Sequence, residues 1–193
     1  MPLLLAAACT GGGSDGAPPA TRPPAASTST TTTAVDDLGE GFAPERDGRR
    51  RLNGFGEVAA TITAADGSTC EVCLLAATTE AQRERGLMEV TDRDLGGYDG
   101  MLFRFPAEID GGFWMRNTPM PLSIAYFDGE GAFVSATDMV PCSDSASCPT
   151  YAADAAFRWA LEVPAGRLGD LGVGDGAVIR VDATRCPRAE PAA

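Results

Sequence analysis

The chain has 193 residues, of which 44% are hydrophobic, so it can form one domain with a substantial core. Its net charge is −12 and all 15 of its basic residues are arginine, a balance that opposes nucleic-acid binding because such binding requires clustered cations. The sequence contains no histidine, which excludes Ser-His-Asp and Cys-His nucleophilic sites, HExxH zinc sites and imidazole bases.

The first nine residues form a short apolar run that ends in Cys9 and is followed by Gly- and Ser-rich sequence. This pattern resembles the end of a bacterial lipoprotein signal, in which the cysteine becomes the lipid-bearing first residue of the mature protein. The run is too short to span a membrane and short for a signal peptide, so we expect the natural signal to begin before Met1. We predict export and anchoring to the outer face of the cell membrane by lipid on Cys9. The alternative is an unprocessed apolar N-terminus on a cytoplasmic protein.

Residues 10–53 are predicted to form a disordered tether. Gly, Pro, Ala, Ser and Thr dominate as far as residue 33, and such sequence cannot bury enough apolar surface to offset the entropy lost on ordering. The remainder carries mixed charge without hydrophobic periodicity. The folded domain is predicted to cover residues 54–187, and residues 188–193 to form a short tail.

A β-hairpin is predicted to begin the domain. Residues 57–64 alternate between apolar and polar types, Asp66-Gly67 supplies a turn, and residues 69–76 return as the second strand. A capping-box pattern that starts at Thr79 then predicts one short helix over 79–86.

The aromatic side chains are densest in the middle of the chain. Met101–Phe105 and Phe113–Met115 are two apolar runs around a Gly-rich loop, and we predict that they pair as the central hairpin. Further strands are expected at 122–127, 132–140, 158–163 and 177–182, with one helical turn at 168–174. Many short strands with one clear helix predict a mainly β domain, either an antiparallel barrel or a two-sheet sandwich.

Five cysteines remain if Cys9 is acylated. Cys142 and Cys148 flank a short Ser-rich loop, so in an exported protein they are expected to form a disulfide. Cys70 and Cys73 lie three apart on a predicted strand, and their side chains therefore point to opposite faces. Cys70 shares a face with apolar neighbours and is expected to be a buried thiol, which leaves Cys73 to pair with Cys186.

A zinc site is the alternative use of these cysteines. Cys70, Cys73, Cys142 and Cys148 could supply four thiolates. The oxidising compartment and the position of the first pair on a strand argue against this site, so no metal or other cofactor is expected.

A candidate ligand-binding face lies on the strand that begins at Phe113. Trp114 and Arg116 share one face of that strand, where an indole beside a guanidinium can stack on a planar or sugar-like ligand and hold its anionic group. The candidate binding residues are Trp114, Arg116, Asn117, Asp138 and Tyr151, with Glu162 as a further polar partner. The alternative is structural: Trp114 packs under the loop 141–151, and Arg116 pairs with a carboxylate.

Several motifs occur in order along the predicted domain. They are Glu84-Arg85-x-Leu87-Met88, Gly100-Met101-Leu102-Phe103-x-Phe105, Phe113-Trp114-Met115-Arg116-Asn117-Thr118, Pro121-Leu122-x-Ile124, Pro141-Cys142, Cys148-Pro149-x-Tyr151 and Ala160-Leu161-Glu162-Val163 with Ala165-Gly166. This set, which spans residues 58–182, resembles the domain of unknown function 192 family of bacteria and archaea. The resemblance implies a compact β-rich domain, often exported or lipid-anchored, with no established activity. Ser123 stands where many members have Asp, so a role that depends on that carboxylate is not expected here.

The preferred functional hypothesis is non-catalytic binding of a small molecule or a cell-envelope component at the Trp114/Arg116 face. Enzymatic activity stays open, since the chain has many carboxylates but no evident nucleophile–base pair. Two alternatives follow: a carboxylate-dependent hydrolase that acts on envelope glycan, and a protein-interaction or structural module. The oligomeric state is not predicted.

Overall fold

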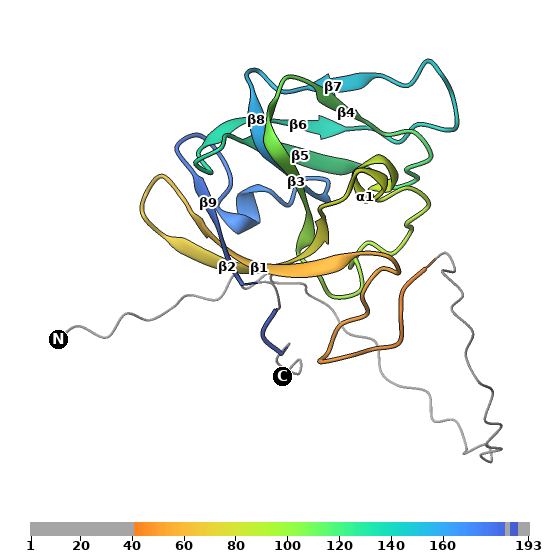
Figure 1. Cartoon of the computed structure of the whole chain (residues 1–193), viewed down its shortest axis with the longest axis horizontal. Coiled ribbons are helices and arrows are strands. Elements are labelled where there is room, and N and C mark those ends of the chain that lie inside the picture. Colours follow the sequence, from red (N-terminus) through yellow and green to blue (C-terminus); the bar gives the residue numbers. More distant parts are fainter. Residues whose placement is uncertain (1–40, 184–185, 189–193) are drawn as a thin grey trace, which may run out of the picture.

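The computed structural model describes residues 41–183 and 186–188, and Figure 1 shows how their helices and strands are arranged. The elements are β1 (Gly56–Thr63), β2 (Thr69–Ala77), α1 (Glu80–Arg85), β3 (Gly100–Ile109), β4 (Gly112–Trp114), β5 (Leu122–Phe127), β6 (Phe133–Met139), β7 (Thr150–Ala152), β8 (Phe157–Pro164), the 3₁₀ turn η1 (Gly169–Leu171) and β9 (Val178–Ala183). The expected signal at residues 1–9, the tether up to residue 40 and the tail from residue 189 lie outside the described residues.

Seven of the strands form one sheet in the order β6-β5-β8-β3-β2-β1-β9, and β4 pairs with β7 in a second, two-stranded sheet. All pairs in the large sheet are antiparallel except β2 with β3. The large sheet curls so that its two edges meet at one end. There the Phe133 amide donates to the Ala177 carbonyl at 2.9 Å and the Ile179 amide to the Gly131 carbonyl at 2.8 Å. The expectation of a mainly β domain is confirmed.

Both faces of the large sheet carry clusters of buried apolar residues. Inside the curl, alternate residues of its strands pack with Leu171 and Val173 from the segment around η1. The opposite face carries apolar residues such as Met101 and Phe103. Segments outside the sheet cover this second face and contribute Leu52, Leu87, Val90, Leu95, Met115 and Met120. The second face therefore depends on loops and short elements to exclude water.

The local predictions for the first part of the domain are confirmed. β1 and β2 form a hairpin through the turn at Asp66, which accepts hydrogen bonds from the Ser68 amide and hydroxyl. Thr79 caps α1 by accepting from the Gln82 amide, and the Gln82 side chain accepts from the Thr79 amide in return. Gly86 ends the helix at a positive φ of 48°.

The predicted central hairpin is wrong. β3 lies between β2 and β8 in the large sheet, whereas β4 leaves that sheet and pairs with β7, a strand that was expected to be loop. Gly112 makes this pairing possible, because a Cβ there would lie 2.4 Å from the Tyr151 carbonyl oxygen. The two apolar runs are thus close in sequence but belong to different sheets.

The tether prediction is also wrong for residues 41–53. Phe42 and Leu52 form a bridge across a small hairpin, and Leu52 is only 1% exposed. The Arg50 amide donates to the Gly96 carbonyl at 2.8 Å, which fixes the hairpin against the loop that precedes β3. Two apolar anchors in a charged segment leave no periodic pattern, so the sequence pattern did not indicate this structure.

The two expected disulfides, Cys73–Cys186 and Cys142–Cys148, are both present. Cys70 is buried as expected, but the expectation of a free thiol there is wrong, since the described residues include no free cysteine. Two disulfides are consistent with an extracytoplasmic domain. Within the described part of the chain, no helix is long and apolar enough to cross a membrane.

Loss of the two disulfides is predicted to have unequal effects on stability. Cys73–Cys186 closes a sequence separation of 113 residues and Cys142–Cys148 one of only 6. Chain entropy then gives about 4–5 kcal/mol for the first and about 2 kcal/mol for the second. Denaturant unfolding of C73A/C186A and C142A/C148A measures both. Equal losses of unfolding free energy in the two variants would contradict this prediction.

Candidate functional site

An aromatic cleft of about 610 Å³ lies between α1, β3 and β4. Its apolar walls come from Phe103, Phe105, Phe113, Trp114, Ile109 and Phe157. The rings pack edge to face, with centroids 4.8 Å apart for Phe103 and Phe113 and 5.4 Å apart for Phe105 and Phe157. This volume is in the range that holds a drug-sized molecule, and the lining is of the kind that such molecules occupy.

β4 places its two aromatic side chains in different surroundings. Phe113 is half-buried against the second core face, whereas Trp114 is 52% exposed at the mouth of the cleft. This alternation agrees with the sequence expectation that the two residues point to opposite sides of the strand. Trp114 therefore does not pack as an ordinary core residue and is available to a ligand.

Glu162 supplies a buried carboxyl to the cleft. It stands on β8, where its partners in the flanking strands are Met101 and Ile124, both fully buried. The side chain is only 4% exposed, and burial alone raises the pKa of this carboxyl to about 8. At neutral pH the group is consequently protonated in most molecules.

The Glu162 carboxyl has no hydrogen-bond or ion-pair partner among the described residues. Within the same part of the chain, every side-chain oxygen or nitrogen that is inaccessible to solvent has a hydrogen-bond partner. Its oxygens must therefore reach the open space of the cleft that Glu162 lines. Burial also raises the pKa of the neighbouring Tyr126 hydroxyl, and the negative charge of Glu162 adds to that effect. Tyr126 donates its own proton to the Tyr151 carbonyl at 2.6 Å.

The positive charges at the rim of the cleft are held by other groups. Arg83 donates to the carbonyls of Thr78 and Arg104, and its guanidinium lies 5.0 Å from the centre of the Phe105 ring. Arg85 donates to the Asn53 carbonyl. Both arginines line the cleft, but neither pairs with the buried carboxyl.

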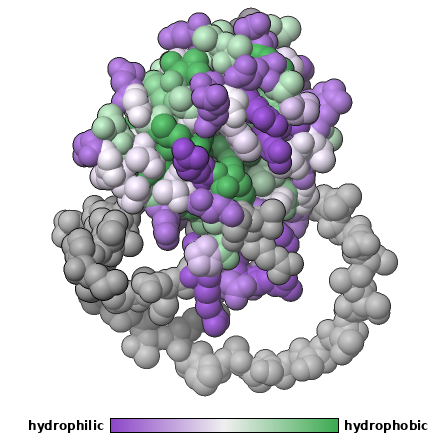
Figure 2. Space-filling view, turned by 60° about the vertical axis from the view of Figure 1, so that its left-hand side comes forward, coloured by the Kyte–Doolittle hydropathy of each residue, from purple (hydrophilic) through white to green (hydrophobic). Residues whose placement is uncertain are grey.

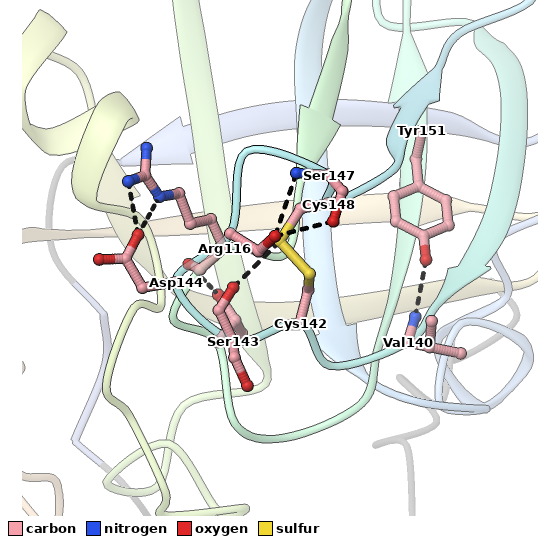
Figure 3. Close-up of a disulfide and its surroundings, with 10 residues drawn as sticks. Arg116, Val140, Cys142, Ser143, Asp144, Ser147, Cys148 and Tyr151 are labelled. Atoms are coloured by element: carbon pink, nitrogen blue, oxygen red, sulfur yellow. Dashed lines mark hydrogen bonds and ion pairs between the residues drawn. A yellow bond between two sulfur atoms is a disulfide. The ribbon is translucent and has the colours of Figure 1, made fainter.

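Arg116 does not line the cleft with Trp114. Arg116 pairs with Asp144 at 2.5 Å, beside the Cys142–Cys148 loop (Figure 3), which is the structural alternative raised for this residue. The strand ends at Trp114, so strand alternation does not extend to Arg116. The guanidinium is thus occupied by a carboxylate outside the cleft.

The other three candidate residues also lie outside the cleft lining. Asn117 adopts a positive φ of 54°, and its carbonyl accepts from the Glu89 amide at 2.8 Å. Asp138 accepts from the Ser123 hydroxyl, which in turn accepts from the Gly166 amide at 2.8 Å. The Tyr151 hydroxyl accepts from the Val140 amide at 3.0 Å (Figure 3). The side chains of Asp138 and Tyr151 thus have structural partners, and Asn117 is held through its backbone carbonyl.

The sequence pattern missed most of the cleft. Trp114 was identified, and Glu162 was named only as a further polar partner, although a charged residue within the apolar run of β8 was a usable signal. Phe105 and Phe157 come from strands far apart in sequence, and no local pattern indicates that their rings meet.

The alternative of a four-thiolate zinc site is contradicted. Cys73 is bonded to Cys186, and Cys142 to Cys148, so these sulfurs are not available as thiolates. The described residues contain no group of three or more His, Cys, Asp or Glu side chains that could hold a metal ion.

The buried carboxyl predicts a specific dependence of stability on pH. The pKa of Glu162 is 4.5 when exposed and about 8 in the folded protein, so between these values the folded state binds more protons than the unfolded state. The contribution of Glu162 to the free energy of unfolding is fully present below pH 4.5. It declines as the pH rises to about 8, by at most about 1.4 kcal/mol per pH unit. Glu162→Gln removes this decline because the amide does not ionise.

Chemical denaturation of the wild type and of E162Q from pH 5 to pH 9 tests this dependence. E162Q should gain stability relative to the wild type as the pH rises. A constant difference between the two proteins over this range would contradict the raised pKa.

Comparison with known proteins places the fold in a family. No curated protein matches the chain. A structure of a "putative transcription regulator" from Sinorhizobium meliloti 1021 is 24% identical, with a TM-score of 0.56, and the match covers 66% of this chain and 95% of that one. A structure of a protein of unknown function from Novosphingobium aromaticivorans DSM 12444 is also 24% identical, with a TM-score of 0.56. This match covers 79% of this chain and 99% of that one. At these identities the likeness concerns the fold alone. The model of DUF192, a family described as an uncharacterized ACR, matches residues 61–181, and the chain belongs to this family.

Proposed function

We propose that this domain binds a small, largely apolar molecule in the aromatic cleft without transforming it. The observation that carries the proposal is the cleft itself: about 610 Å³, walled by aromatic rings and open at an exposed Trp114. An exposed indole beside a preformed apolar cavity is typical of ligand sites, where ring surface is removed from water on binding. The binding residues are therefore Trp114, Phe105, Phe113 and Glu162, in place of the predicted Trp114/Arg116 pair.

The same proposal includes a location at the cell envelope. The two disulfides support an extracytoplasmic site, because such bonds persist in oxidising compartments. The short apolar run that ends in Cys9 supports lipid anchoring to the outer face of the membrane. An anchored binding domain would meet envelope components and imported small molecules.

Hydrolysis of an envelope glycan is a second candidate function, and one observation favours it. Glu80 and Glu84 of α1 line the same cleft as the protonated Glu162, so an acid and a carboxylate are both available. The apolar walls weigh against this candidate, since they offer few hydrogen bonds to sugar hydroxyls.

A broad protein-binding surface is less well supported on the face in Figure 2, where polar residues interrupt the apolar ones.

A neutral fluorescent probe tests binding in the cleft. N-phenylnaphthylamine should bind the full chain with enhanced emission, and Trp114→Ala should weaken its binding about tenfold. Loss of roughly 60 Å² of apolar contact at about 25 cal/mol per Å² amounts to roughly 1.5 kcal/mol. Phe105→Ala should weaken it similarly, because that ring forms part of the wall.

Val140→Ala is the matched control, because Val140 is 62% exposed but lies outside the cleft lining. This variant should bind the probe as the wild type does. Equal binding by all three variants, or no binding by the wild type, would exclude the cleft as the site.

Lipid anchoring is tested in a bacterial host that is supplied with an alkyne fatty acid. The wild-type chain should incorporate the label and fractionate with membranes, and Cys9→Ser should do neither, since the thiol is the acceptor of the lipid. An unlabelled wild type, or a labelled Cys9→Ser variant, would refute the anchor.

A further inference from the structure

The unpaired Glu162 carboxyl indicates what kind of ligand the cleft selects. A buried polar group without a hydrogen bond or ion pair lowers stability, and most such groups in folded proteins are paired. Glu162 is nine-tenths buried and has no partner among the described residues, yet its oxygens reach the cleft. Among the described residues, the protein thus presents a carboxyl without a partner in the lining of a ligand-sized space.

Aromatic rings line the same cleft as that carboxyl. Phe103 of β3 pairs with Ala160 of β8, which lies two positions before Glu162. Phe113 packs against Phe103. Aromatic faces carry negative electrostatic potential and attract cations. The two arginines at the rim do not satisfy the carboxyl, because Arg83 and Arg85 are held by backbone carbonyls.

We infer that the cleft selects an organic ammonium ion with an apolar body, whose positive group meets the Glu162 carboxyl while its body lies among the rings of Phe105, Phe113 and Trp114. This inference rests on the binding function proposed above. The net charge of −12 supports it, since an acidic protein raises the local concentration of cations at its surface. A carboxylate ligand, in contrast, forms no ion pair with Glu162 in either protonation state and meets a like charge once Glu162 ionises above about pH 8.

Proton release would accompany the binding of such a ligand. Glu162 is mostly protonated at neutral pH and must ionise to pair with a cation, so affinity should rise with pH up to about 8. The other charged or titratable groups that line this space are Glu80, Arg83, Glu84 and Arg85 on α1, and the buried Tyr126 hydroxyl on β5 interacts electrostatically with Glu162. A quaternary ammonium probe carries a charge that does not titrate, so its pH dependence reports on the protein alone.

The test uses two isosteric probes with the full chain: para-trimethylammonio-benzyl alcohol and its neutral counterpart para-tert-butylbenzyl alcohol. Competition with N-phenylnaphthylamine measures the affinity of each. The cation should bind about tenfold more tightly for each pH unit between pH 6 and pH 7.5, and this increase should level off above about pH 8. The neutral probe should show no such slope.

Glu162→Gln should abolish the slope for the cation and leave the affinity of the neutral probe within about twofold. Glu130→Gln, an exposed carboxylate in the β5–β6 turn, should retain the slope and serves as the matched control. Equal affinity for the two probes at pH 8.5, or an unchanged slope in E162Q, would overturn the inference while the proposed binding function stands. Failure of both probes and of N-phenylnaphthylamine to bind would overturn both.

Discussion

The structure depends on two clusters of buried apolar residues, one on each face of a curled seven-stranded sheet. The inner face closes on itself, because the edge strands β6 and β9 meet and the η1 segment fills the remaining space. The outer face cannot be covered in this way and relies on short segments. These segments bury Phe103 and Met101 completely but leave a cleft where α1 and β4 diverge over β3. The candidate site is therefore a consequence of how the outer face is covered.

Glu162 acquires its properties from the same arrangement. A central position on β8 places its carboxyl among apolar side chains of the outer face, and desolvation then raises its pKa. An exposed carboxyl in a turn, such as Asp128, is instead satisfied by local backbone amides. A carboxyl with no partner in a ligand-sized cavity is a common feature of functional sites, because structural roles do not need it.

Sequence reasoning succeeded where structure is determined locally. The alternation in β1, the turn at Asp66 and the capping box at Thr79 depend on residues a few positions apart, and each was predicted. The separation of β4 from β3 was missed because it depends on the close approach of Gly112 to Tyr151, far along the chain. Trp114 was identified as accessible, but Arg116 was assigned to the same face by an alternation that ends at the last residue of β4.

The protonation state of Glu162 tests the central claim most directly. Carbon-13 NMR of the side-chain carboxyl, assigned with E162Q in the full chain, follows its ionisation between pH 4 and pH 10. A buried carboxyl that lines an apolar cleft predicts a midpoint of about 8, displaced when the quaternary ammonium probe binds. A midpoint near the exposed value of 4.5, unaffected by the probe, would show that the group is solvated and would contradict the account of the site.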